Sequence, residues 1–338
     1  MTIHSNPTVD DVAKLAGVST ATVSRCINNP EKVLAPTRKK VQVAVDELGY
    51  TPNFGGRYLA SNRSRTVGAI IPTMENAIFA RGIQAFQEVL ANSGITLLIS
   101  TSGYDPQLEF QNIQALVSQG AEGLLLIGTA RPKKTYEFLQ RRNIPHVIAW
   151  NHRQDGEHLY VGFDNHFAMF ELTNTVLKMG HRHIAIIAGP TTNNDRIEDR
   201  ISGAQDAIQK TKGASLIIKV SRSNSSPILA GQAFEDLMAL EIRPTVIMCS
   251  NDALAVGAIM RARDMGISVP DDISITGFDD IDVAEIVTPS LTTVHVPHRQ
   301  MGEAAATLLL NIRAGKPDQK SIKLDTRVVL RHSLKTQK

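Results

Sequence analysis

Small and hydroxylated side chains, together with one arginine, are concentrated in residues 19–28. If this segment is helical, Val23 and Ile27 point inward, and the side chains left outward are Thr20, Ala21, Thr22, Ser24 and Arg25. Small side chains allow close approach to a groove, hydroxyls reach phosphates and bases, and arginine pairs with O6 and N7 of guanine. The segment therefore suits a DNA major groove, although a two-helix corner with a solvated Ser/Thr face has the same pattern.

Two further helices are expected to position this face. Thr8 and Asp11 have the spacing of the box that starts a helix, in which each side chain bonds the other residue's amide. Gly17 provides the left-handed turn that ends the first helix, and Ser19 is placed to cap the second. Residues 36–48 predict a third helix that closes a small core.

Composition limits the class of protein. The chain has 338 residues, of which 42% are hydrophobic and 20% charged, as expected for a soluble protein with two or three domains. Cys26 and Cys249 fit neither a disulfide framework nor a metal site, which favours a reducing compartment. The first residues resemble no export signal and no run is long enough to span a membrane, so we expect a cytoplasmic protein without a membrane partner.

Positive charge is concentrated at the N-terminal end. Residues 1–65 contain nine Lys or Arg and five Asp or Glu. Residues 66–338 contain 27 Lys or Arg and 28 Asp or Glu. A surface that binds phosphates needs its positive charge in this place.

The segment after the third helix is small, polar and basic. Gly55 and Gly56 are adjacent in it, and Leu59 is an apolar residue flanked by arginines. It reads either as a flexible linker or as a helix over about residues 53–61 that forms only with help. Such a short helix is marginal in water, and each glycine costs nearly 1 kcal/mol relative to alanine.

From residue 66 the pattern becomes that of an α/β protein. Apolar runs begin near residues 67, 96, 123 and 146 and alternate with helix-like segments, and a similar series follows residue 161. Helices are predicted at 78–91, 106–119, 132–142, 167–179, 196–212, 228–240, 252–265 and 298–311. Runs buried on both faces with helical crossovers imply two doubly wound parallel sheets, and thus two lobes with a ligand cleft between them. The last segments are expected to cross back to both lobes.

Enzymatic chemistry finds no support in the sequence. The turn after the first strand, IIPTMENAIF, lacks the glycines of a dinucleotide site, and no Walker lysine pattern occurs. No metal spacing and no activated nucleophile are recognisable, so we expect no enzyme, no metal and no cofactor. The alternative is a sugar solute-binding protein without a regulatory role, which would need an export signal and would lack a basic helix-turn-helix.

Several motifs, in order, resemble the lac repressor (LacI/GalR) family of bacterial transcription factors. They are VDDVAKLAGVSTATVSR, ELGYTPN, GHRHIA, PTVIMCSNDALAVGA, GISVPDDISITGFDD and PSLTTV. The resemblance covers essentially the whole chain. It implies an all-α helix-turn-helix headpiece followed by an α/β two-lobed sensor that resembles periplasmic sugar-binding proteins. The implied division is a headpiece at 1–52, a hinge at 53–65 and a sensor at 66–338, with lobes at about 66–162 plus 296–318 and about 163–292 plus 319–338.

The resemblance also implies how the protein meets DNA. A homodimer would place two headpieces on the half-sites of a pseudo-palindromic operator in double-stranded DNA, with paired hinge helices in the central minor groove. Thr20, Ala21 and Arg25 match positions that read bases, and Leu59 matches the leucine that wedges into the central base step. The positions that match phosphate contacts or the hinge entry are Ser19, Thr22, Ser24, Asn28, Tyr50 and Asn53. Because no leucine heptad ends the chain, a dimer is expected and not a tetramer.

The family places effector contacts on loops that match this sequence. The residues at the matching positions are Phe79, Trp150, Asp164, Arg196, Arg200, Asn251, Asp252 and Asp279. An aromatic face covers the C–H surface of a polyol, while Asp, Asn and Arg bond hydroxyls or a carboxylate. The alternatives are that Asp252 only caps a helix, that Trp150 belongs to the core and that Arg200 is a solvated charge.

The implied function is a transcriptional regulator, namely a repressor of a carbohydrate catabolism or uptake operon controlled by a small sugar or sugar acid. The serines of SRSNSSP, residues 221–227, stand where a purine-binding relative offers an aromatic side chain. These serines argue against a flat nucleobase as the effector. They favour the gluconate-responsive branch of the family. The sequence departs from the family pattern at Phe54 and at the Gly55–Gly56 pair, where the family often has polar and Ala or Val residues. The glycine pair predicts a hinge helix whose folding costs more free energy.

Overall fold

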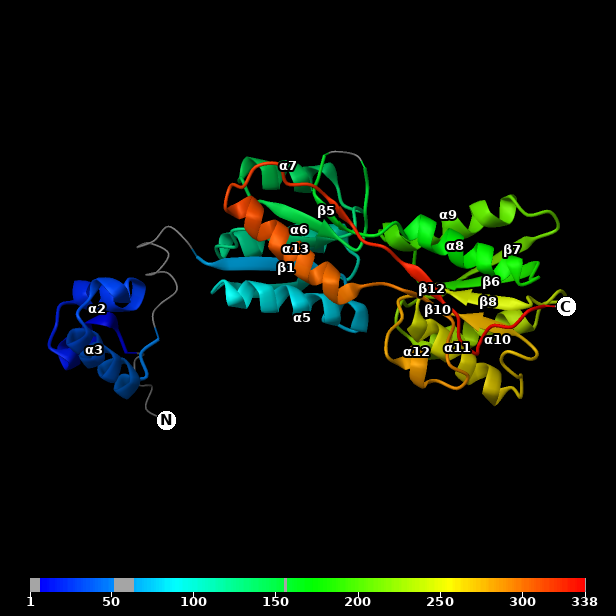
Figure 1. The fold of residues 1–338 in the computed structure, drawn as a ribbon, viewed down its shortest axis with the longest axis horizontal. Coiled ribbons are helices and arrows are strands. Elements are labelled where there is room, and N and C mark those ends of the chain that lie inside the picture. The colour runs from blue at the N-terminus through cyan, green and yellow to red at the C-terminus, as the bar shows by residue number, and fades with distance from the viewer. Residues whose placement is uncertain (1–6, 52–63, 155–156, 338) are drawn as a thin grey trace. The chain divides into compact units, whose positions relative to one another are not determined.

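The computed structural model describes residues 7–51, 64–154 and 157–337. The chain forms two compact units, Met1–Ser64 and Arg65–Lys338, which we describe separately (Figure 1). The predicted hinge residues Asn53 and Leu59 lie outside the described residues. None of the helices in the described ranges is long and apolar enough to cross a membrane.

The first unit is the predicted three-helix headpiece. Its helices are α1 (Val9–Ala16), α2 (Thr20–Asn28) and α3 (Ala35–Leu48), with a 3-10 turn, η1, at Pro30–Lys32. The Asp11 carboxylate accepts from the Thr8 amide at 2.9 Å, and the Asp11 amide donates to the Thr8 hydroxyl at 3.3 Å, which confirms the capping box. Gly17 ends α1 with a φ of 64°, and Ser19 caps α2, as predicted.

The headpiece core is small. Its buried side chains are Val12, Ala13, Val23, Cys26, Val41 and Ala44. Cys26 was not predicted here, although it is separated by three residues from Val23 and so lies on the same face of α2. Burial of Val23 and Cys26 leaves the opposite face of α2 for other contacts.

The N-lobe of the second unit has a six-stranded parallel sheet. The strand order is β11-β5-β4-β3-β1-β2. The strands are β1 (Thr66–Ile71), β2 (Thr96–Thr101), β3 (Leu124–Ile127), β4 (His146–Ala149), β5 (Tyr160–Gly162) and β11 (Ile322–Lys323). Helices α5 (Ala77–Asn92) and α13 (His298–Arg313) cover one face, and α6 (Pro106–Ser118) and α7 (Lys133–Arg141) cover the other.

The C-lobe repeats this plan with four parallel strands in the order β7-β6-β8-β9. They are β6 (His183–Ala188), β7 (Ser215–Val220), β8 (Val246–Cys249) and β9 (Ser274–Thr276). Helices α8 (Asn165–Lys178) and α9 (Asp195–Gln209) pack on one face. Helices α10 (Pro227–Met238) and α11 (Asp252–Asp264) pack on the other, followed by the short α12 (Val283–Ile286). The two predicted parallel sheets are confirmed.

The chain crosses between the lobes three times. Two of the crossing segments pair as the antiparallel strands β10 (Thr293–His295) and β12 (Arg327–Val329), which lie at the junction in Figure 1. The last crossing was predicted after residue 318, but β11 still pairs with β5 of the N-lobe, so the chain leaves this lobe after Lys323. A strand of two residues is too short to show the alternation by which strands are recognised.

Candidate DNA interface and effector cleft

The outward face of α2 has the predicted composition. Thr20, Ala21 and Arg25 are exposed, and Thr22 and Ser24 are half-buried. Within the described residues, no ion pair engages the Arg25 guanidinium, so its donors are available to a ligand. An exposed helix face with small side chains and a free guanidinium is what base-edge contacts require.

Three of the other predicted DNA contacts have roles within the headpiece. The Ser19 hydroxyl accepts from the Thr22 amide at 3.2 Å, and the Asn28 side-chain amide donates to Ser24 at 3.3 Å. Tyr50 is half-buried against the headpiece core. These bonds preorganise the face of α2, and contact with phosphate remains a prediction for all of these residues.

The second candidate site is a cleft between the lobes with an empty volume of about 350 Å³. Side chains from the N-lobe helix α5 and the ends of β2 and β4 meet side chains from α9 and from the loops after β7, β8 and β9 of the C-lobe. The lining residues are Asn76, Ile78, Phe79, Tyr104, Trp150, Asn194, Arg196, Ile197, Arg200, Asn224, Asn251 and Asp279. Six of the eight predicted effector residues are therefore brought together at the cleft.

An aromatic pair forms the N-lobe wall. The rings of Phe79 and Trp150 meet edge to face with their centroids 5.5 Å apart, and each side chain is about 1% exposed. The indole N–H of Trp150 donates to Nδ1 of His298 at 3.2 Å. A side chain at Gly82 would collide with the Trp150 ring, so only glycine leaves room for the indole. Trp150 is thus both part of the core and part of the cleft lining.

Arg200 and Asp279 form the polar floor. Arg200 is 4% exposed and donates to Asn165 at 2.9 Å, to the carbonyl of Ser250 at 2.6 Å and to Asp279 at 3.4 Å. Its guanidinium also lies 3.6 Å from the centroid of the Phe278 ring. The alternative of a solvated charge is therefore wrong. Burial raises the pKa of Asp279 to about 6, although Arg200 opposes the shift.

Two predicted effector residues lie away from the cleft lining. Asp252 is fully buried and accepts from the hydroxyl of Thr293 at 2.6 Å and from the Ile281 amide at 2.8 Å. Asn251 and not Asp252 caps α11, by accepting from the Leu254 amide. The sequence alone could not show which of the adjacent residues Asn251 and Asp252 would cap the helix and which would be buried in the core.

Asp164 is the other residue that the structure places elsewhere. Its carboxylate caps α8 by accepting from the Phe167 amide at 2.9 Å, and it lies 3.7 Å from the ammonium of Lys323. Asp164 is therefore engaged at the surface and is not among the residues that line the cleft.

Arg196 is fixed by a buried carboxylate that also joins the lobes. Its guanidinium donates to Oδ1 of Asp195 at 3.0 Å. The other oxygen of Asp195 accepts three hydrogen bonds from the N-lobe, each of 2.7 Å, from the amide and hydroxyl of Thr129 and from the side chain of Asn151. We call Asp195, Thr129 and Asn151 the interlobe clasp.

Six lining residues were missed from the sequence, namely Asn76, Ile78, Tyr104, Asn194, Ile197 and Asn224. The side-chain oxygens of Asn194 and Asn224 are buried, and in the described part of the chain they accept no hydrogen bond. Tyr104 could have been found, because its loop, SGYDP, joins the end of a parallel strand to a helix start. In SRSNSSP the cleft residue is Asn224, whereas Ser226 caps α10 and Ser225 bonds Glu75, so the serines are not the lining residues predicted from that tract.

Comparison with known proteins settles the family. Residues 8–53 match the family described as "Bacterial regulatory proteins, lacI family", and residues 173–334 match the "Periplasmic binding protein-like domain". The HTH-type transcriptional repressor CytR of Escherichia coli K12 is 34% identical over 309 residues, which cover 91% of this chain and 90% of that protein. The chain belongs to the lacI family.

Two further proteins agree with this assignment. The HTH-type transcriptional regulator GntR of E. coli K12 is 32% identical over 90% of this chain and 91% of its own length. A crystal structure of the lac repressor dimer bound to operator and the anti-inducer ONPF superposes with a TM-score of 0.83 at 25% identity, over 97% of this chain and 99% of that one.

As a member of the lacI family, the protein is a DNA-binding transcriptional regulator and not an enzyme. The match over residues 8–53 excludes the alternative of a solute-binding protein without a regulatory role.

The buried Asp252 gives this lacI-family sensor a testable pH dependence. Burial and the neighbouring Asp279 raise the pKa of Asp252 from 3.8 to about 8. Between these two pH values the folded state holds a proton that the unfolded chain has lost, so this group's contribution to stability is lost as the pH rises toward 8. We expect Asp252→Asn to make the free energy of unfolding fall less between pH 4 and 8 than in the wild type, measured by urea denaturation.

Asp264→Asn, at an exposed position near the end of α11, is the control for removal of a negative charge. Equal pH slopes for wild type and Asp252→Asn would contradict the assignment.

Proposed function

We propose that this protein is a homodimeric repressor of genes for the uptake or catabolism of a carbohydrate, and that a small sugar or sugar acid in the interlobe cleft controls its binding to the operator. The observation that carries the proposal is the combination in one cleft of an aromatic wall with buried polar groups. Sugars present apolar C–H faces and a rim of hydroxyls, and this lining complements both.

The polar groups of the cleft favour a hydroxylated ligand. The unpaired oxygens of Asn194 and Asn224 need hydrogen-bond donors, because a buried acceptor without a partner costs about 1–3 kcal/mol. Ligand hydroxyls supply such donors. Arg196, which is 7% exposed, has further N–H groups that suit a carboxylate. A gluconate-like acid is the narrower form of the proposal.

Exposed apolar side chains support the homodimer. Six of the large ones in the sensor are Met74 in the loop after β1, Ile99 and Val220 on the edge strands β2 and β7, and Ile228, Met260 and Ile286 on α10, α11 and α12, between 40% and 77% exposed. Single exposed apolar residues are ordinary on a protein surface, but side chains of this size and exposure are the kind that a subunit interface buries. The lac repressor, a relative with the same fold, was crystallised as a dimer on its operator.

The proposed coupling between the two sites is a change of the angle between the lobes. A ligand that bonds both lobes stabilises one angle, which changes the spacing of the two hinge segments in a dimer. Such coupling amounts to about 1–3 kcal/mol, or roughly 5- to 150-fold in operator affinity.

The DNA-binding half of the proposal is tested with Arg25→Ala. We expect specific operator affinity to fall by about 1–3 kcal/mol, with relaxed preference at one base pair, because a bidentate contact to guanine is lost. The measurement is a gel shift of DNA from upstream of this protein's own gene, with all single-base variants of the bound site.

The matched control is Lys39→Ala on the exposed start of α3. It should weaken binding to all sequences alike. The slope of log affinity against log salt concentration should also become shallower by about one, because one phosphate contact is lost. Uniform weakening by Arg25→Ala, with no change in base preference, would argue against a reading role for Arg25.

The sensing half is tested with Asp279→Asn, which keeps the shape of the side chain but removes the charge. We expect the ligand response to be lost while operator binding without ligand is unchanged, because Asp279 lies in the cleft and not in the headpiece. The fluorescence of Trp150, which is the only tryptophan, reports binding during titrations of sugars and sugar acids. Asp264→Asn serves as the control, and a retained response would remove Asp279 from the site.

A further inference from the structure

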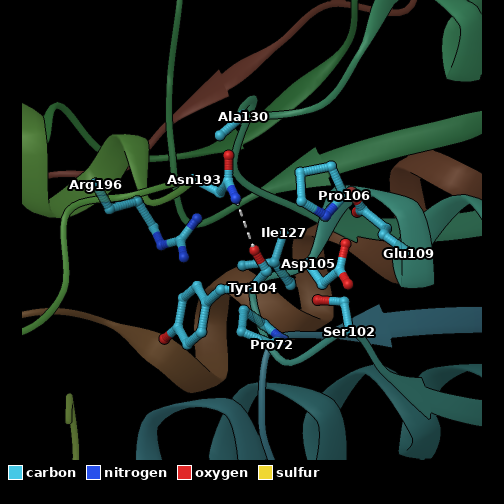
Figure 2. Close-up of a pocket in the computed structure, with 10 residues that line it drawn as sticks. All are labelled: Pro72, Ser102, Tyr104, Asp105, Pro106, Glu109, Ile127, Ala130, Asn193 and Arg196. Carbon is cyan, nitrogen blue, oxygen red and sulfur yellow. Dashed lines mark hydrogen bonds between the residues drawn. The ribbon is translucent and has the colours of Figure 1, made fainter. Parts of the chain in front are cut away.

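A second hollow adjoins the effector cleft. It has an empty volume of about 290 Å³ and is lined mainly by residues of the N-lobe (Figure 2). The two hollows share only Tyr104 and Arg196 among their lining residues. We call the cleft with Trp150 the inner compartment and the second hollow the outer compartment.

The boundary between the compartments is built from both lobes. Tyr104 comes from the loop after β2, and Arg196 comes from the first turn of α9. The Asn193 side chain donates to the carbonyl of Tyr104 at 3.2 Å, which closes one side of the outer compartment (Figure 2). Tyr104 and Asn193 both have positive φ angles, of 63° and 57°. Such conformations cost free energy in residues other than glycine and are concentrated at functional sites.

The outer compartment has free carboxylate oxygens. Oδ1 of Asp105 accepts from two amides at the start of α6, and Oε1 of Glu109 accepts from Arg131. Across residues 7–51, 64–154 and 157–337, no hydrogen bond reaches Oδ2 of Asp105 or Oε2 of Glu109. Glu109 is only 7% exposed, so its free oxygen is held in the wall of the hollow. Carboxylate oxygens are strong acceptors for ligand hydroxyls.

The remaining lining is apolar and compact. Pro72, Pro106, Ile127 and Ala130 contribute C–H surface beside these acceptors. Acceptors and apolar patches side by side match a second hydroxyl-bearing ring. They do not match a simple anion, because two of the three charged side chains in the lining, Asp105 and Glu109, are negative and only Arg196 is positive.

We propose that the effector has two hydroxylated units, one in each compartment, joined across the boundary formed by Tyr104 and Arg196. The inference rests on the proposed function, because it assumes that the inner compartment binds a sugar unit. It narrows the effector class to disaccharides or sugar acids that carry a second sugar.

The test compares matched probes that differ by one unit, namely glucose with cellobiose and gluconate with cellobionate. Binding is followed by Trp150 fluorescence and calorimetry on the full chain. We expect a two-unit probe to bind at least about tenfold more tightly than its one-unit partner, which is the effect of one hydrogen bond to a charged group.

Two variants assign that advantage to the outer compartment. Ala130→Leu fills the hollow, and Glu109→Gln removes the charged acceptor while it keeps the oxygen that faces Arg131. Each should abolish the advantage of the two-unit probe and leave the one-unit probe unchanged. Ala314→Leu, at an exposed position after α13, is the control for an added side chain.

The outcomes separate the two proposals. Tight binding of one-unit probes, with no advantage for two units, overturns the inference and supports the proposed function. Equal weakening of both probes by Glu109→Gln also overturns the inference. If the wild type binds none of the four probes, the proposed sugar-sensing function fails, and the inference fails with it.

Discussion

The carboxylate of Asp195 is the group on which the geometry of the sensor depends. It begins a C-lobe helix, yet one of its oxygens accepts three hydrogen bonds from the N-lobe. Burial alone would raise the pKa of Asp195, but the charge of Arg196 and the bonds from Thr129 and Asn151 lower it overall. The clasp therefore joins the lobes with a charged acceptor, and each of its bonds is stronger than one between neutral groups.

The clasp also determines how closely the lobes approach. Gly128, with a φ of 69°, lies directly against Asp195 and Arg196, and any side chain there would collide with both. One turn further along α9, Asp199 pairs with Arg153 of the N-lobe at 2.8 Å. Acidic residues on one helix thus hold the N-lobe along one edge of the cleft, and Arg196 is fixed in the cleft lining. A ligand that bonds Arg196 and the aromatic wall together stabilises the same arrangement, which is how occupancy can be linked to the angle between the lobes.

Much of this architecture could be predicted from the sequence because it depends on local patterns. The Thr8–Asp11 box, the helix-ending Gly17 and the apolar strands each act over a few residues, so the helix and strand positions were confirmed to within a few residues. The interlobe clasp was not predictable in this way, since it joins residues 44 and 66 positions apart. The same limit explains the errors at Asp252 and Asp164. Their polar side chains follow strand ends, as ligand residues do, but packing of neighbouring segments turned one into the core and the other to the surface.

The most direct test of the central role of the clasp is the Thr129→Val substitution, which removes one donor to Asp195 and keeps the shape of the side chain. Thr135→Val is the matched control, because the Thr135 hydroxyl is buried without a hydrogen-bond partner among the described residues. The measurement is the affinity, from Trp150 fluorescence, for the sugar or sugar acid that binds the wild type most tightly. We predict that Thr129→Val weakens this affinity about tenfold while operator binding without ligand is unchanged, which corresponds to the loss of one hydrogen bond to a charged group. Equal affinities for the two variants and the wild type would contradict the account.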